Sequence, residues 1–233
     1  MKYLDTTSLF ATIDHVSEAL LFGMEIDQKE KTDIARFIAG RQGMDNAYAN
    51  TFAPTEKDMK GDFLLLTGEK IRSRVGKCHM AGEEAGRILR KLGVKNSMVG
   101  TALDAADSGL RKQIERVLQD PHSEFGMYCC KSCSCGLWLN LSSGGPYSDG
   151  QMVKAGLNLL KRYRDNKGRW KGFPYYYVLH ILNELESRLA FDEMRYAAPL
   201  IEKNLKKNKT EVSKYDVRRN FIREQILKKV GSN

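Results

Sequence analysis

The sequence predicts an all-α protein, and three observations support that fold class. Only 5 of the 233 residues are proline, so long stretches of the chain are free to form helices. Apolar residues recur at helical spacing, and runs of alternating β-branched residues, which are typical of strands, are few. An apolar content of 42% at this length is sufficient for one packed core. We therefore expect a single helical domain over residues 1–233.

Helices are expected along the whole chain, joined by short turns. Their predicted ranges are 7–22, 27–39, 55–66, 77–92, 97–118, 128–141, 149–163, 174–188, 191–206 and 212–229. The third range starts with Thr55 and Asp58, which resemble a capping box, and Pro54 keeps the preceding helix from running through. The clearest loop is the string SSGGP at 142–146, so we place a weak subdivision of the domain near 142–148.

The segment 154–182 predicts a hairpin of two antiparallel helices. Leu157 and Leu160 share one helical face in its first half. Gly168 lies in the turn that ends this first helix, and Pro174 can begin the second one. The architecture expected from this pattern is a set of antiparallel helical hairpins.

Two segments share one pattern of residue spacing. They are Arg164, Gly168 and Trp170 in the hairpin turn, and Gln42, Asn46 and Tyr48 after an earlier helical run. The pattern resembles the QW motif of triterpene cyclases, with Arg164 in place of the family's Gln. In that family the polar residue holds a helix end and the Trp stacks beside it. The resemblance therefore implies a structural clasp and no catalysis.

The same resemblance implies the α/α toroid fold of terpene cyclases and of the β subunits of protein prenyltransferases. Because the chain is shorter than a complete toroid of these families, we expect an open arc of helices or a closed ring with fewer members. An open arc leaves apolar ends that a homodimer would cover. The resemblance brings no active site, because residues 103–107 read LDAAD and the acidic motif of the protonating cyclases is absent.

Aromatic residues gather at the start of the helix that follows the hairpin turn. In the resembling cyclases such faces line the central chamber and stabilise carbocations, a use consistent with cation–π attraction. The candidate ligand-binding residues are Tyr176, Tyr177 and His180, with Tyr48 and Phe52 as their counterparts after the earlier motif. They predict a cavity or groove for an apolar or isoprenoid-like small molecule, or for a protein segment. Packing of the aromatic rings into the core is the simpler alternative.

Four of the five cysteines lie close together, in the string CCKSCSC that begins at Cys129. If this string is helical, Cys129 and Cys133 share a face, as do Cys130 and Cys133. The predicted ligands of a metal, zinc in the first place, are Cys129, Cys130 and Cys133, with His122 as nitrogen donor if the upstream loop folds back. A common structural zinc site takes two ligand pairs from separated segments, whereas this chain offers one C-x-x-C and no second pair. The alternatives are buried structural thiols and a redox or nucleophilic thiol, so catalysis stays unassigned.

A second group of reactive residue types surrounds His79. This residue follows Cys78 and lies on one predicted helical face with Glu83, so a nucleophile with a base and a carboxylate can be imagined. Adjacent residues on a helix point about 100° apart, however, so the order of Cys78 and His79 in the sequence is weak evidence for catalysis. A surface pair of His79 and Glu83 explains the spacing as well.

The net charge of +9 is concentrated at the C-terminal end. Residues 201–233 hold ten Lys or Arg against four Asp or Glu, which accounts for +6 of it. An amphipathic helix at 212–229 with a solvated cationic face is the ordinary explanation. The alternative is a basic module that binds nucleic acid, an anionic membrane surface or another acidic partner.

The N-terminal string MKYLDTTSLF contains no continuous apolar segment of signal-peptide length. Nowhere in the sequence do roughly 18 apolar residues occur in a row, so we expect no transmembrane segment. The odd number of cysteines also argues against a secreted disulfide framework. We therefore expect a cytoplasmic protein.

Overall fold

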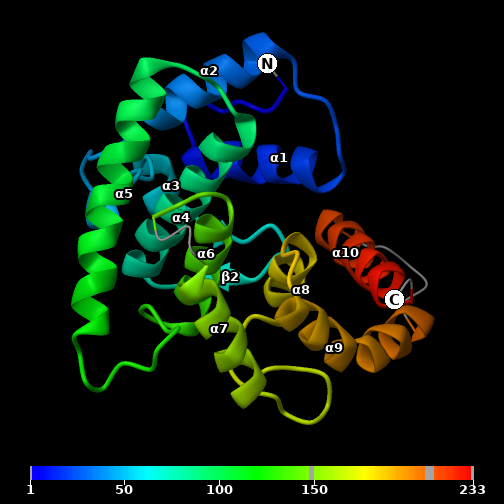
Figure 1. Cartoon of the computed structure of the whole chain (residues 1–233). Helices are drawn as coiled ribbons and strands as arrows, with labels where there is room; N and C mark the ends of the chain where they lie inside the picture. Colours follow the sequence, from blue (N-terminus) through cyan, green and yellow to red (C-terminus); the bar gives the residue numbers. More distant parts are fainter. Residues whose placement is uncertain (1, 147–149, 208–212, 232–233) are drawn as a thin grey trace.

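Figure 1 shows the computed structural model, which describes residues 2–146, 150–207 and 213–231. The helices, in chain order, are α1 (Leu9–Leu21), α2 (Gln28–Ala39), α3 (Glu56–Lys60), α4 (Arg74–Leu92), α5 (Ser97–Leu118), α6 (Lys131–Ser142), α7 (Gln151–Arg162), α8 (Tyr175–Glu184), α9 (Arg188–Lys207) and α10 (Lys214–Gly231). The other elements are a 3-10 turn, η1 (Tyr48–Asn50), and two strands that pair antiparallel, β1 (Phe63–Leu64) and β2 (Lys70–Ile71). The all-α prediction is confirmed. Within the described ranges, no helix is both long enough and apolar enough to cross a lipid bilayer.

Most predicted helices agree with the structure to within a few residues at each end, and the exceptions have local causes. The capping box of Thr55 and Asp58 is present, but α3 ends at Lys60 because Gly61 adopts an extended backbone. The predicted helix at 55–66 is therefore wrong in its second half, where β1 begins at Phe63. The toroid arrangement stays a prediction. The domain subdivision near 142–148 overlaps residues 147–149, which lie outside the described residues.

Helix α4 lies at the centre of the fold, in contact with α1, α2, α5 and α6 (Figure 1). Its contact with α6 is close, because a Cβ atom added at Gly136 would lie 2.8 Å from the Cε atom of Met80. A polar link crosses the same interface. Asn140 donates from Nδ2 to Glu83 (2.8 Å), and Arg90 donates to Asn140 Oδ1 (2.7 Å). The absence of a side chain at Gly136 thus allows the close approach, and one buried and one partly buried hydrogen bond hold the two helices there.

The loop that contains η1 packs against α4 and α5 at two glycines. A Cβ atom at Gly82 of α4 would lie 2.1 Å from Thr51 Oγ1, and one at Gly109 of α5 would lie 2.1 Å from the carbonyl oxygen of Ala49. Ala49 itself has a positive φ of 48°, a conformation that side-chain-bearing residues rarely adopt. These close contacts fix the loop and with it the ring of Tyr48.

The turn between α7 and α8 is fastened to α9. Arg164 and Trp170 form a β-bridge, and Arg164 donates from Nε and Nη2 to the carboxylate of Glu193 on α9 at 3.1 and 2.8 Å. Trp170 Nε1 donates to the same carboxylate at 2.8 Å, and the Trp170 side chain is buried. Gly168 has φ +87°, and a Cβ atom there would lie 2.8 Å from Cβ of Leu200 on α9. The predicted motif residues thus meet in one turn, with Glu193 as their shared partner.

The earlier motif is built differently. Gln42 forms a β-bridge with Phe52, not with Tyr48, and its Nε2 donates to the carbonyl oxygen of Asn50 (2.8 Å). Asn46 has a positive φ of 71° and accepts a hydrogen bond from Arg74 of α4. The ring of Tyr48 packs on His79 of α4. The two segments share a spacing but not a set of contacts.

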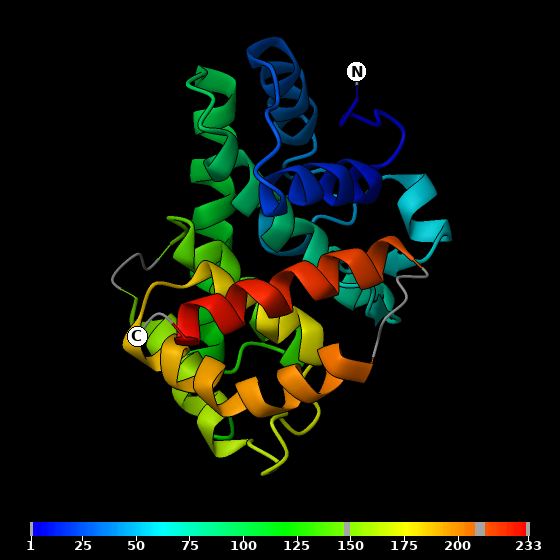
Figure 2. The same ribbon diagram turned by 90° about the vertical axis from the view of Figure 1, so that its right-hand side faces the viewer.

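Helix α10 packs across α8 and α9 (Figure 2). Arg218 is fully buried and donates to both carboxylate oxygens of Asp14 at 2.6 and 3.0 Å, and to Glu18 at 3.0 Å. Arg223 is also buried, and Arg219 donates to the carbonyl oxygen of Thr67 (2.6 Å). Part of the positive charge of the C-terminal segment is therefore bound inside the molecule.

We expect Glu193→Ala to lower the free energy of unfolding by about 2–4 kcal/mol, because Trp170 Nε1 and the guanidinium of Arg164 lose their shared acceptor. Asp192→Ala is the matched control, because Asp192 is the exposed acidic neighbour and should change stability by less than about 0.5 kcal/mol. Urea denaturation followed by circular dichroism measures both variants. Equal stability of the two variants would contradict a stabilising role for this turn.

A glycine pair on α5 tests the packing of the η1 loop. Gly109→Ala should destabilise the protein by about 1–3 kcal/mol, because the new methyl group meets the backbone of Ala49. Gly100→Ala should be neutral or stabilise by up to about 1 kcal/mol, because no heavy atom of the described structure lies within 4 Å of the added Cβ atom and alanine favours helix. Thermal unfolding of the two variants gives the comparison, and a stabilised Gly109→Ala variant would refute the close contact.

Candidate metal centre

The predicted range 128–141 puts the whole cysteine string inside a helix, and this prediction is wrong at its start. Helix α6 begins at Lys131, and Cys130 is its N-cap with extended backbone angles (φ −134°, ψ 172°). The backbone N–H of Cys133 donates to Cys130 Sγ (3.5 Å), which satisfies one of the free amides at the helix start. Cys130 and Cys133 are thereby brought together by a helix cap rather than by a shared helical face.

The loop before α6 is tied to this first helical turn. The backbone N–H of Tyr128 donates to Ser134 Oγ (2.9 Å), and that hydroxyl donates to the carbonyl oxygen of Cys130 (2.8 Å). Further back, Trp138 Nε1 donates to the carbonyl oxygen of Gly126 (2.9 Å). Gly126 has φ +98° and approaches α7 so closely that a Cβ atom would lie 2.6 Å from the carbonyl carbon of Ala155. These contacts bring the segment that contains Cys129 back beside Cys133.

His79 faces this turn from α4. The residue is only 2% exposed, and neither ring nitrogen has a hydrogen-bond partner among the described residues. The ring of Tyr48 covers the imidazole, with 3.3 Å between the ring centroids, and Tyr128 lies 5.6 Å away. A buried polar side chain without a partner is costly and uncommon in native proteins. The arrangement of His79 therefore requires an explanation.

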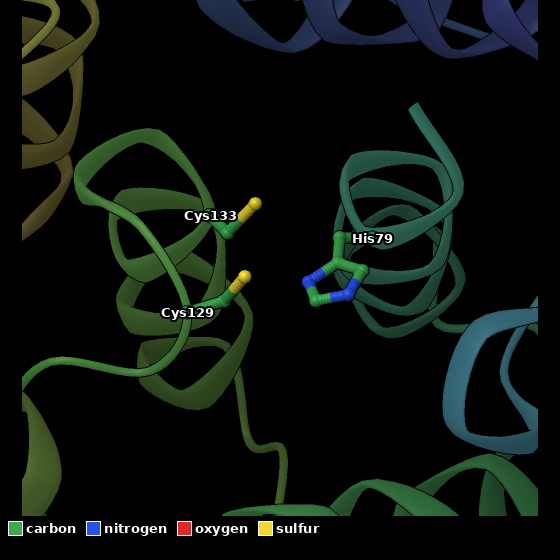
Figure 3. Close-up of side chains that lie close together, drawn as sticks. All are labelled: His79, Cys129 and Cys133. Carbon is green, nitrogen blue, oxygen red and sulfur yellow. The ribbon is translucent and has the colours of Figure 1, made fainter. Parts of the chain in front are cut away.

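Figure 3 shows the side chains of Cys129 and Cys133 directed toward the His79 ring. One ligand atom from each of these three residues lies within 4.8 Å of the other two. Cys130 adjoins the group, with its Sγ 3.3 Å from Cys133 Sγ. Ligand atoms around a tetrahedral zinc ion are about 3.5–3.8 Å apart, given Zn–S and Zn–N bonds of about 2.3 and 2.0–2.1 Å. Small side-chain rotations would therefore bring His79, Cys129 and Cys133 to zinc-binding distances, whereas Cys130 lies outside this group of three.

The protonation states of these groups follow from burial and from their mutual hydrogen bonds. Burial lowers the pKa of His79 to about 4, so the imidazole is neutral at pH 7, which is the form that binds metals. Hydrogen bonds from the Cys133 side chain and from nearby backbone N–H groups lower the pKa of Cys130 to about 6. Cys133 donates a hydrogen bond to Cys130, and this bond, together with burial, raises the pKa of Cys133. Partial burial raises the pKa of Cys129. A bound cation would deprotonate these thiols, because coordination favours the thiolate.

Glu83 lies one turn beyond His79 on α4 and is also buried. Burial raises the pKa of its carboxyl to about 8, so the group is protonated at neutral pH. It accepts the hydrogen bond from Asn140 but forms none with His79, so the His79–Glu83 pair considered from the sequence does not occur in the described structure. Glu83 is a neutral buried neighbour of the cysteine group.

His122 does not belong to the group. It is exposed in the loop after α5, where its backbone N–H donates to Asp120 (2.9 Å), and the nitrogen donor beside the cysteines is His79 instead. Sequence reasoning did not place His79 beside the cysteines, because it is distant along the chain and reaches them only through the packing of α4 on α6. The one local signal is that His79 lies among apolar and small residues of α4, most of them buried.

The predicted ligand-binding residues lie in different parts of the structure. Tyr177 and Phe52 are fully buried in the core, and the Tyr177 hydroxyl donates to Glu84. His180 is 1% exposed and lies 3.8 Å from Glu184, and Tyr176 is half-buried beneath the guanidinium of Arg219. Tyr48 lies on His79, in the candidate metal centre.

A shared ligand pocket for these aromatic residues stays a prediction. An open groove on the surface is lined by other residues, among them Phe125, Lys154 and Arg162.

Comparisons of the chain with protein-family models, with curated proteins and with solved structures give no match. The functional argument therefore rests on the geometry described above.

Glu83→Gln tests the buried carboxyl. The pKa of Glu83 is raised from 4.5 in the unfolded chain to about 8, so the protein loses stability as the pH rises between these values, by roughly 1.4 kcal/mol per unit. Below pH 4.5 the carboxyl is protonated in both states and the loss vanishes. In chelator-treated protein, the advantage of Glu83→Gln should therefore grow from pH 5 to pH 8, while Glu202→Gln, at an exposed carboxyl of α9, should show none. Denaturant titrations across this pH range check the trend, and a pH-independent difference would contradict it.

Proposed function

We propose that this protein binds one zinc ion between α4 and the start of α6, through His79, Cys129, Cys133 and Cys130. The observation that supports the proposal most is the state of His79. A buried imidazole, neutral at pH 7 and without a hydrogen-bond partner in the described structure, faces two cysteine sulfurs at distances that a metal ion can bridge. A cation would satisfy the imidazole nitrogen that faces the thiols.

The donor set favours zinc over other common ions. Three thiolates and one imidazole are soft to borderline ligands, which select against magnesium and calcium. A tetrahedral arrangement of sulfur and nitrogen donors is typical of structural zinc sites. Cys130, whose Sγ lies 3.3 Å from that of Cys133, would supply the fourth donor after a side-chain rotation. The site needs reduced thiols, which agrees with the cytoplasmic location expected from the sequence.

The proposed role of the ion is to fasten the segment before α6 to the central helix α4. Three of the four donors come from one short segment and the fourth comes from α4, so the ion would close a long loop of the chain. Binding of the ion to the folded state alone would stabilise that state. The nucleic-acid and isoprenoid-ligand hypotheses remain predictions, and the internal ion pairs of Arg218 reduce the charge available to the former.

Metal analysis by mass spectrometry of protein purified without chelators tests the proposal. We expect about one zinc per chain, and a fall of roughly 5–10 °C in the unfolding temperature after chelation, the effect of about 2.7 kcal/mol in a chain of this size. Cobalt substitution should add thiolate-to-metal charge-transfer absorption. His79→Ala and Cys133→Ser should lose most of the metal because each removes a ligand.

Two variants serve as controls for these losses. Cys78→Ser alters the cysteine next to His79, and His122→Ala removes the exposed histidine of the upstream loop, and both should keep full stoichiometry. Circular dichroism separates loss of metal from loss of fold. A metal-free wild-type protein that neither takes up zinc nor gains stability from it would refute the proposal, as would full zinc content in a folded His79→Ala variant.

A further inference from the structure

Cys130 and Cys133 form an asymmetric pair at the start of α6. Cys130 is exposed to solvent, whereas Cys133 is buried, and their sulfur atoms lie 3.3 Å apart. A disulfide bond is about 2.05 Å long, so rotation of the side chains must close a gap of about 1.3 Å. The exposed sulfur of Cys130 accepts a hydrogen bond from the backbone N–H of Cys133, and this interaction favours a thiolate at this position. One thiol is thus open to attack an external molecule and the other is positioned to attack the first.

Cys129 is unsuited to serve as the second thiol of the pair. It is the direct neighbour of Cys130, and consecutive Cα atoms are about 3.8 Å apart, below the range of about 4.4–6.8 Å that an unstrained disulfide spans. The separation of Cys130 and Cys133 across one helical turn carries no such restriction. The geometry therefore selects Cys133 over Cys129.

We propose that Cys130 and Cys133 exchange with small disulfides in solution and that the resulting protein disulfide releases the metal ion. The second part rests on the proposed zinc site, because Cys130 and Cys133 belong both to the dithiol and to the ligand set. A sulfur atom in a disulfide bond carries no negative charge and is a poor ligand. Oxidation leaves only His79 and Cys129, which are too few to hold zinc tightly.

The reaction proceeds in two steps. The Cys130 thiolate attacks one sulfur of the substrate disulfide, whose S–S bond breaks, and the departing thiolate takes a proton from water. Cys133 loses its proton or its metal bond and attacks Cys130 Sγ, which breaks the mixed disulfide and releases the second substrate thiol. The protein dithiol gives up two electrons and two protons, and the substrate disulfide is reduced to two thiols.

The test treats the full-length zinc-loaded protein with glutathione disulfide as the probe. A colorimetric zinc indicator follows release, and peptide mass mapping finds the linked residues. We expect a disulfide between Cys130 and Cys133, zinc release in step with it, and recovery of both thiols and zinc after addition of dithiothreitol. Cys133→Ser should stop at a glutathione adduct on Cys130, whereas Cys130→Ser should form no disulfide between positions 130 and 133 and should form any glutathione adduct roughly tenfold or more slowly. Cys78→Ser should react like the wild type.

The outcomes separate this inference from the proposed function. Zinc-loaded protein that gains neither adduct nor disulfide overturns the dithiol and leaves the zinc site standing. A disulfide that forms while zinc stays bound overturns the coupling. If the protein holds no zinc but still forms the Cys130–Cys133 disulfide, the zinc site fails, the coupling fails with it and the exchange reaction stands. A disulfide that links Cys129 to either cysteine instead contradicts the assignment of the pair.

Discussion

The close packing of α4 against α6 determines which residues meet in the candidate site. Gly136 lets the helices approach, because a side chain there would have to displace the end of the Met80 side chain. Asn140, one turn further along, bridges Glu83 and Arg90 across the same interface. Since residues three or four apart share a helical face, the face that carries Gly136 and Asn140 also presents Cys133 to α4. The position of His79 opposite the thiols is therefore a consequence of the helix packing.

The metal hypothesis also accounts for an energetic imbalance in the centre of the fold. His79 lies buried, and neither of its ring nitrogens has a hydrogen-bond partner within the described part of the chain. Each such group costs about 1–3 kcal/mol when it is taken from water and left unpaired. Coordination would remove the penalty for one ring nitrogen of His79. The same ion would hold the loop before α6, which otherwise depends on backbone contacts of Gly126 and Tyr128.

Local patterns in the sequence predicted the helices and part of the site, and the remainder depends on tertiary contacts. The α7–α8 turn with Arg164 and Trp170 could be anticipated because its residues are close in sequence. The cysteine group could be anticipated for the same reason, but its helix start could not, since the cap at Cys130 and the loop before it depend on contacts to Ser134 and Trp138. His79 could not be selected over His122 from the sequence, because that choice depends on how α4 and α6 pack.

X-ray absorption spectroscopy at the zinc edge of the purified, reduced protein tests the central claim most directly, because it reports the donor atoms themselves. The account predicts a first shell of three sulfur atoms at about 2.3 Å and one nitrogen atom at about 2.0–2.1 Å. The nitrogen contribution should show the outer-shell scattering of an imidazole and should disappear in His79→Ala. A shell of only oxygen and nitrogen atoms, or an imidazole signal that persists without His79, would contradict the site described for this protein.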